Sequence, residues 1–199
     1  RDFDDIRPMG LEEAVHRALA DEGEKLDALD FATSEALEGR HARRVGTRFI
    51  EQRACSVPAD PDACFEAVSR IGGESGWYWG DWLWRLRGAL DRLVGGPGMR
   101  RGAPARRPPE AGDTLDFWTV VRCEPGSRLT LRADMRLPGE ALLDLRVRPL
   151  AGGGSRIEQT ASFDARGLLG IGYWLALHRL HALVFDGMLR GLAREAERR

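Results

Sequence analysis

The clearest pattern in the chain is a strict alternation of apolar and polar side chains over residues 128–137. Apolar residues occupy every odd position from Leu129 to Leu137, and arginine, threonine or aspartate occupies the even positions. A period of two predicts a β-strand with one buried face and one hydrated face, as antiparallel sheets allow. Similar alternation over 114–121, 143–147 and 157–163, with Gly- and Pro-containing turns between these segments, predicts an antiparallel meander. In the segment 114–121, one face is expected to contain Leu115, Phe117, Thr119 and Val121.

A strand and a short helix are predicted before the meander. Residues 45–57 have the composition of a strand, and Asp60-Pro61 follows as a helix start, with Asp60 as N-cap and Pro61 at the first helical position. Gly72-Gly73 would end this helix. Its buried stripe is expected to contain Cys64, Phe65, Val68 and Ile71.

Three further helices are predicted from apolar residues at helical spacing. One covers 11–20 within a charged connector at 1–42, and a second covers 81–94 and ends at a Gly-Gly-Pro-Gly sequence. The third is the longest, from about 169 to about 195, and we expect it to lie across the sheet. The fold class predicted is α+β, with a tail at 1–42 and one domain at 43–199.

Composition and charge exclude several classes of protein. The 199 residues are 43% hydrophobic and 31% charged with a net charge of −1, which lacks the basic field of a nucleic-acid-binding protein. Three widely spaced cysteines with no C-x-x-C predict neither a disulfide framework nor a zinc site. No uninterrupted apolar run reaches the roughly 20 residues of a membrane span, and no signal peptide is recognisable. We expect a cytoplasmic protein.

Two motifs that suggest cofactors fail on inspection. The glycines of 167–172 are spaced G-x-x-G-x-G, the reverse of the dinucleotide fingerprint, and no parallel β-α-β unit follows them. A strand-to-helix corner explains them better. His178 and His181 are three residues apart on the last helix, but no acidic residue or third histidine accompanies them, so no metal site is predicted. Either histidine could instead carry a proton or bind a ligand.

The aromatic segment at 77–84 has three interpretations. It contains more large rings than one short helix face can bury, namely those of Trp77, Tyr78, Trp79, Trp82 and Trp84. Core packing is the simplest explanation. The others are a lid over an apolar cavity, formed by Trp77, Trp79 and Trp82, and a surface for docking a partner. No catalytic motif such as G-x-S-x-G is present.

Several whole segments together resemble a known bacterial family. They are Gly112-Asp113-Thr114-Leu115-Asp116-Phe117-Trp118, the strand from Leu129 to Gly139, the stretch from Ile157 through Gly170, Tyr173-Trp174, Gly187-Met188-Leu189 and the aromatic segment from Gly76 to Trp84. On these residues the chain resembles domain-of-unknown-function family 2867 over roughly 45–194. This resemblance implies a helix-grip fold of the START and polyketide-cyclase type, in which an antiparallel sheet wraps around a long C-terminal helix.

The resemblance also implies a pocket and a partner domain. A small hydrophobic ligand would bind between sheet and long helix, and the candidate pocket residues are Trp118, Leu131, Met135, Leu145, Trp174, His178, His181 and Phe185. Members of the family commonly follow an NmrA-like, NAD(P)-binding domain of the short-chain-dehydrogenase type. We therefore expect no cofactor in this chain, NAD(P) in an upstream Rossmann domain, and a longer protein, since residue 1 is Arg. The alternatives are a self-contained cyclase or hydratase that uses a pocket histidine, and a structural or dimerisation module; the oligomeric state stays open.

Overall fold

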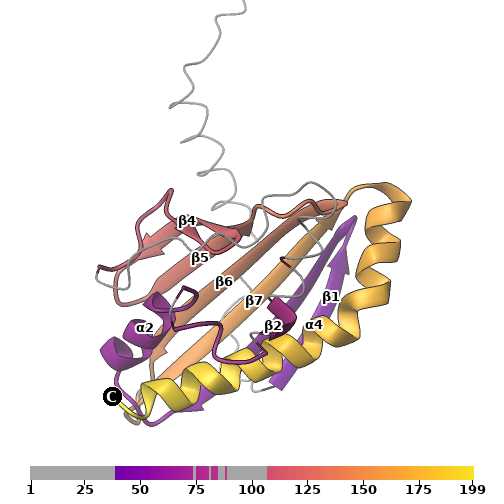
Figure 1. The fold of residues 1–199 in the computed structure, drawn as a ribbon. Helices are drawn as coiled ribbons and strands as arrows, with labels where there is room; N and C mark the ends of the chain where they lie inside the picture. The colour runs from indigo at the N-terminus through magenta and orange to yellow at the C-terminus, as the bar shows by residue number, and fades with distance from the viewer. Residues whose placement is uncertain (1–38, 74, 81, 85–87, 89–106) are drawn as a thin grey trace, which may run out of the picture. The chain divides into compact units, whose positions relative to one another are not determined.

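The computed structural model describes residues 39–73, 75–80, 82–84, 88 and 107–199. Figure 1 shows that these residues form one broad sheet, with a short helix and a long helix on the same face. The predicted helix at 11–20 lies outside the described residues. So do most of the predicted helix at 81–94, of which 82–84 are described and helical, and the tail before residue 39.

The sheet has seven strands, and every neighbouring pair is antiparallel. Their order is β1-β2-β7-β6-β5-β4-β3, so β2 pairs with β7 and joins the N-terminal hairpin to the meander. The strands are β1 (Gly39–Val45), β2 (Arg48–Val57), β3 (Thr114–Leu115), β4 (Trp118–Glu124), β5 (Arg128–Ala133), β6 (Gly139–Pro149) and β7 (Ser155–Ala165).

Both helices begin where the sequence predicts. Helix α2 (Pro61–Ser69) has Asp60 as its N-cap, and the Asp60 carboxylate accepts a hydrogen bond from the backbone N–H of Ala63. Helix α4 (Gly167–Ala196) is 30 residues long and packs against β7, β2 and α2. The succession of strand, helix, antiparallel sheet and long terminal helix is an α+β helix-grip fold, and the predicted fold class is confirmed.

The sheet begins earlier than the domain boundary expected at residue 43. Strand β1 pairs with β2 from Gly39↔Ala54 to Val45↔Arg48. Its sequence, Gly-Arg-His-Ala-Arg-Arg-Val, carries too many charges to be recognised as a strand, and residues 41–45 are exposed. Charged side chains suit an edge strand because they discourage pairing with another chain. The fold therefore reaches into the segment that we had assigned to the tail.

The predicted single strand at 114–121 is wrong. Strands β3 and β4 form a tight hairpin with Leu115↔Trp118 as its last pair, and Asp116 takes a φ of 56° at the turn. Residues 116 and 117 form the turn, so the strand pattern does not continue through them. The inward-facing position before the turn is Leu115, and the first one after it is Trp118. Trp118 and Val120 therefore belong to the main core, Thr119 is half-buried, and Val121 is only 5% exposed but lies outside that core cluster.

The face of β5 that was expected to be hydrated is partly buried. Arg128 is 5% exposed, and Thr130 on the same face is fully buried. The Asp144 carboxylate on β6 accepts hydrogen bonds from Arg128 Nε at 2.8 Å and from Thr130 Oγ1 at 2.6 Å. Arg146 Nε donates to the other Asp144 oxygen at 2.7 Å. Mutual hydrogen bonding is what allows charged groups on this face to be buried.

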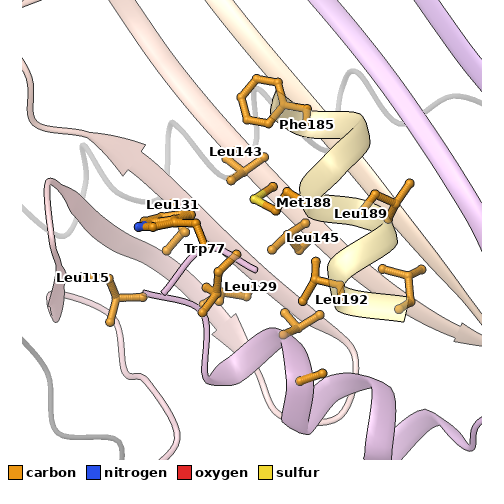
Figure 2. Close-up of a cluster of buried hydrophobic side chains, with 14 of the residues drawn as sticks. Trp77, Leu115, Leu129, Leu131, Leu143, Leu145, Phe185, Met188, Leu189 and Leu192 are labelled. Carbon is orange, nitrogen blue, oxygen red and sulfur yellow. The ribbon is translucent and has the colours of Figure 1, made fainter. Parts of the chain in front are cut away.

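The main core fills the space between the sheet, α2 and the C-terminal half of α4. Figure 2 shows leucines of β5 and β6 meeting Met188, Leu189 and Leu192 of α4, with Trp77 beside them. The inward positions Leu129, Leu131, Leu143 and Leu145 are confirmed, since all four are fully buried, but β5 ends at Ala133 and does not extend to Leu137 as predicted. This packing holds the C-terminal half of α4 against the sheet. The N-terminal half of α4 does not contribute to this core cluster.

Helix α4 is the one helix of the described residues that is long and apolar enough to cross a membrane. This is weak evidence, because the core helix of a soluble protein has the same length and composition. Met188 and Leu192 on its inner side are fully buried against the sheet. Its outer side exposes a series of leucines, namely Leu168, Leu169, Leu175, Leu180 and Leu183.

Candidate functional site

A cavity of about 320 Å³ lies between the N-terminal half of α4 and the sheet. Ala161 and Phe163 of β7 contribute from the sheet, and Met135 and Leu137 contribute from the connection between β5 and β6. Small Ala161 leaves room where larger residues elsewhere on this face would fill the space. The long helix supplies the opposite wall, through Tyr173, Trp174, Leu177, Leu180, His181, Val184 and Phe185.

Two groups of aromatic side chains border the cavity. In one group, Trp174 stacks on Phe49 and Phe163 with ring centroids 5.4 and 5.7 Å apart, and His181 lies 5.5 Å from Trp174. The other group contains Trp84 and Trp118, which both line the cavity. Stacked and tilted rings at these separations are favourable arrangements, so the walls are well packed.

The lining is apolar and uncharged. Among the described residues that line the cavity, none carries a carboxylate, an ammonium or a guanidinium group. Its polar atoms belong to the Trp, Tyr and His rings and to Ser162. Leu180 is 41% exposed, so the cavity reaches the surface beside α4. Such a site favours a neutral molecule, because a buried charge without a counter-charge is costly.

The structure brings five of the eight predicted pocket residues into the cavity wall: Trp118, Met135, Trp174, His181 and Phe185. Leu131 and Leu145 face the helices as predicted but are fully buried in the main core, nearer to α2 and Met188. His178 does not line the cavity, and its Nδ1 lies 2.8 Å from the carbonyl oxygen of Leu175 in the preceding turn of α4. His181 therefore lines the cavity, whereas His178, about one helical turn before it, does not.

The predicted lid residues lie elsewhere. Trp77 is 1% exposed in the core, and its indole N–H donates to the Asp116 carboxylate at 2.9 Å. Trp79 packs against α4, where Gly187 leaves space for its ring. Trp82 is 65% exposed and does not line the cavity. The same segment nevertheless reaches the cavity through the next two residues, Leu83 and Trp84.

Sequence reasoning missed several wall residues. The alternation of β7 placed Ala161 and Phe163 on the inward face, which was the available signal for them. Tyr173 and Leu177 belong to the apolar side of α4, about two and three turns from the helix start. Nothing local distinguishes Trp84 from the other tryptophans of its segment, since its position depends on contacts with Phe185 and Phe117 from distant parts of the chain.

An ion-pair network around the buried Arg53 lies next to Phe185 of the cavity wall. Arg53 on β2 donates from Nη2 to Glu51 at 2.6 Å and from Nε to Asp186 of α4. The side chains of Arg53 and Glu51 are 2% and 3% exposed, whereas that of Asp186 is 39% exposed. The Arg53 guanidinium also lies 5.7 Å from the ring centre of Phe185, a cavity wall residue. Arg53 thus ties α4 to the sheet beside the cavity.

The thiols of Cys64 and Cys123 and the half-buried phenol of Tyr78 are not activated groups. Burial raises the pKa of the Cys64 thiol and also that of Cys123. A raised thiol pKa lowers the thiolate fraction, which opposes nucleophilic catalysis. Burial likewise raises the pKa of Tyr78 to about 12, and its hydroxyl donates to the Ala67 carbonyl at 2.9 Å. Among the residues that the structure describes, no group of three His, Cys, Asp or Glu side chains could hold a metal ion.

A protein family model matches most of the chain. The family model described as "Protein of unknown function (DUF2867)" matches residues 44–188. The chain belongs to this family. No curated protein matches its sequence.

Solved structures with a similar arrangement of elements have little sequence in common with the chain. The di-domain ARO/CYC protein StfQ from the steffimycin biosynthetic pathway is 13% identical over 76% of this chain, with a TM-score of 0.48, and the chain spans 51% of StfQ. Ara h 8.0201 is 10% identical over 81% of this chain and 100% of its own, with a TM-score of 0.46. The Polyketide_cyc-like protein Cgl2372 from Corynebacterium glutamicum is 12% identical over 74% of this chain and 88% of its own, with a TM-score of 0.44.

Proposed function

We propose that this domain binds a small, mainly apolar molecule in the cavity between α4 and the sheet. The observation that carries the proposal is the cavity itself, with its volume of about 320 Å³ and a lining free of charged side chains among the described residues. This volume falls within the range of about 300–1,000 Å³ that is typical of ligand sites. The proposed pocket residues are those of the predicted set that line it: Trp118, Met135, Trp174, His181 and Phe185.

Filling the cavity is expected to abolish or weaken binding. The neutral fluorescent probe N-phenyl-1-naphthylamine should bind the wild-type domain saturably, at one site per chain. Ala161→Leu places a larger side chain in the cavity floor and should lower the affinity about tenfold or more, because even one excess methylene in a fitted pocket has an effect of this order. The affinity is measured by fluorescence titration.

The matched control for this experiment is Ala176→Leu. Ala176 lies on α4 but is exposed and does not line the cavity, so probe binding should be unchanged. Circular dichroism of both variants establishes that they are folded. Non-saturable probe binding, or equal affinity in folded Ala161→Leu and wild type, would reject the cavity as the binding site.

Catalysis by His181 is the second candidate function, since this imidazole lies in the cavity wall. An imidazole can accept and donate a proton near neutral pH, as a cyclase or hydratase would require. Binding is better supported, because no carboxylate lines the cavity among the described residues to orient the ring. If a bound compound is converted, His181→Gln should abolish turnover and the control His178→Gln should not. Equal turnover in both variants would exclude acid–base catalysis by His181.

The proposed context is an NAD(P)-dependent protein of the cytoplasm. In this proposal the domain shapes or binds the substrate of an upstream Rossmann domain, and residues 1–42 belong to the connection, except for the part paired in β1. The support is the family resemblance and the lack of a dinucleotide fingerprint in this chain. NADPH binding by the full-length protein, measured by calorimetry, should be detectable. Its absence there would remove the oxidoreductase link without affecting ligand binding.

A dimerisation module has less support. The aromatic segment would have to form the interface, yet Trp77 and Trp84 are buried within the domain and Trp79 packs against α4. Only Trp82 among the described tryptophans of this segment is largely exposed. One exposed ring is a common surface feature and does not by itself indicate an interface.

A further inference from the structure

The outer side of α4 is apolar along roughly its first five turns, although it faces away from the sheet. With about 3.6 residues per turn and a rise of about 1.5 Å per residue, its exposed leucines fall within an arc of roughly 140° and a length of roughly 22 Å. The first two of them are 86% and 83% exposed. We call this surface the leucine face, and its residues are Leu168, Leu169, Leu175, Leu180 and Leu183. An exposed apolar surface of this extent indicates a site of contact.

The free charges on the outer side of α4 are all positive. Three arginines there are exposed and have no ion-pair partner among the described residues: Arg179, Arg190 and Arg194. Arg179 lies within the leucine face, and the other two continue the same side of the helix beyond it. The two acidic residues of α4 are both occupied, because Asp186 binds Arg53 and Glu195 binds Arg199. An occupant of this side therefore has to be apolar and to carry negative charge at its edge.

Two other occupants fit this side poorly. Helix α4 cannot cross a bilayer in the folded domain, because Met188 and Leu192 on its inner side are fully buried in the core. A second copy of the chain would bring two arginine-bearing helices together, and like charges in contact are costly. Arg179 would also be enclosed without a free carboxylate beside it, which is the expensive way to bury a charge. Charge complementarity therefore favours an anionic partner.

We propose that the outer side of α4 docks this domain on the surface of a membrane that contains anionic lipids. The leucines enter the boundary between headgroups and acyl chains, and the arginines reach the lipid phosphates. The net charge of the chain is −1, so the local arrangement of arginines and not a general attraction provides the electrostatic contribution. Leu180 also lines the cavity, so the cavity opens at the docked surface. Membrane docking does not depend on the proposed ligand binding.

The test is sedimentation of the full chain with lipid vesicles. One set contains phosphatidylcholine alone, and in the other about one third of the lipid is phosphatidylglycerol. We expect binding to the anionic vesicles to be about tenfold tighter or more, because each arginine near an anionic surface contributes about fivefold. Raising the salt concentration should weaken this binding, since salt screens exposed charges.

The apolar contribution is tested by the double variant Leu175→Gln and Leu183→Gln. Both side chains are exposed and neither lines the cavity, and glutamine has nearly the helix propensity of leucine, so the fold should be retained. Vesicle affinity should fall about tenfold or more, because two apolar side chains no longer enter the bilayer. The matched control is Val45→Gln. Val45 is 50% exposed and pairs with Arg48, on the sheet face away from the helices, so vesicle binding should be unchanged.

The electrostatic contribution is tested by Arg179→Gln, which should weaken binding to anionic vesicles about fivefold and leave binding to neutral vesicles unchanged. The control Arg148→Gln makes the same change in net charge elsewhere. Val147 beside it belongs to the core, and successive strand residues point to opposite faces, so Arg148 lies on the sheet face away from α4. Binding by this control should equal that of wild type.

The outcomes separate membrane docking from the proposed cavity function. Circular dichroism, and binding of N-phenyl-1-naphthylamine without vesicles, report the fold and the cavity independently. No binding to anionic vesicles, or equal binding to both vesicle types, overturns the inference and leaves the cavity function untouched. Losses in the two controls as large as those in the α4 variants also overturn it. A dimer in analytical ultracentrifugation that Leu175→Gln and Leu183→Gln dissociate, without vesicle binding, would assign the leucine face to a second copy instead.

Discussion

Arg53→Met is expected to destabilise the domain by about 3–5 kcal/mol, the usual cost of removing one partner from a buried ion pair. The substitution removes the cation that contacts both Glu51 and Asp186. The Glu51 side chain is 3% exposed and would lose its ion pair with Arg53. The Asp186 side chain is 39% exposed and can be hydrated, so Glu51 accounts for most of the expected loss. Urea denaturation gives the free energy of unfolding.

Two further variants isolate the cause. Adding Glu51→Leu to Arg53→Met replaces both members of the buried pair and should restore part of the lost stability, because apolar replacements of buried ion pairs are often neutral or stabilising. The matched control is Arg166→Met, which breaks an exposed ion pair with Glu140. An exposed pair contributes about 0–1 kcal/mol, so this change should be small. A loss for Arg53→Met no larger than that of Arg166→Met would contradict the role assigned to the buried network.

Gly170→Ala is expected to destabilise the fold by about 1–3 kcal/mol, the usual cost of overpacking. A Cβ at this position would overlap the carbonyl oxygen of Pro138 and lie 3.0 Å from Cα of Ala165. Both are backbone atoms, so neither can turn aside as the end of a long side chain could. The Pro138 carbonyl also accepts the Arg166 N–H at 2.9 Å where α4 begins, which fixes its position. Thermal and urea denaturation measure the change.

Gly172→Ala is the matched control, two residues further along α4. Nothing lies within 4 Å of a Cβ at Gly172, so alanine gains helix propensity there without a collision. It should stabilise the domain by about 0.5–1 kcal/mol. The propensity gain is common to both positions, and the difference between the two variants measures the collision at Gly170. Equal effects in the two variants would show that the helix start can move away from Pro138.

These glycines also illustrate why a motif needs its tertiary context. The sequence Gly167-Leu168-Leu169-Gly170-Ile171-Gly172 resembles a nucleotide fingerprint in composition only. In the structure each glycine has its own surroundings: Gly167 begins α4 with a φ of 64°, Gly170 lies against the turn at Pro138, and Gly172 has no neighbour within reach. The order of the predicted elements is enough to interpret this segment as a strand-to-helix corner. The close contact at Gly170 could not be predicted from that order.

The candidate site was predictable in part. Trp118, Met135, Trp174, His181 and Phe185 were expected to face the space between sheet and helix and do line the cavity. His178 was not separable from His181 by sequence, because both lie on a helix whose inward stripe is broad. The places of the predicted lid residues could not be read from a period either, because the chain changes direction at Gly76, Tyr78 and Gly80, which all have positive φ.

The sequence alone determined the elements whose patterns are local. Alternation defined β5, β6 and β7, helical spacing defined α4, and the Asp60-Pro61 pair marked the start of α2, because side-chain direction within a strand or helix depends only on its period. Tertiary structure decided where charges and cavities lie. Arg53 meets Asp186 across 133 residues, and Trp84 meets Phe185 from another remote segment. Such contacts depend on how distant elements pack, and no period along the chain encodes them.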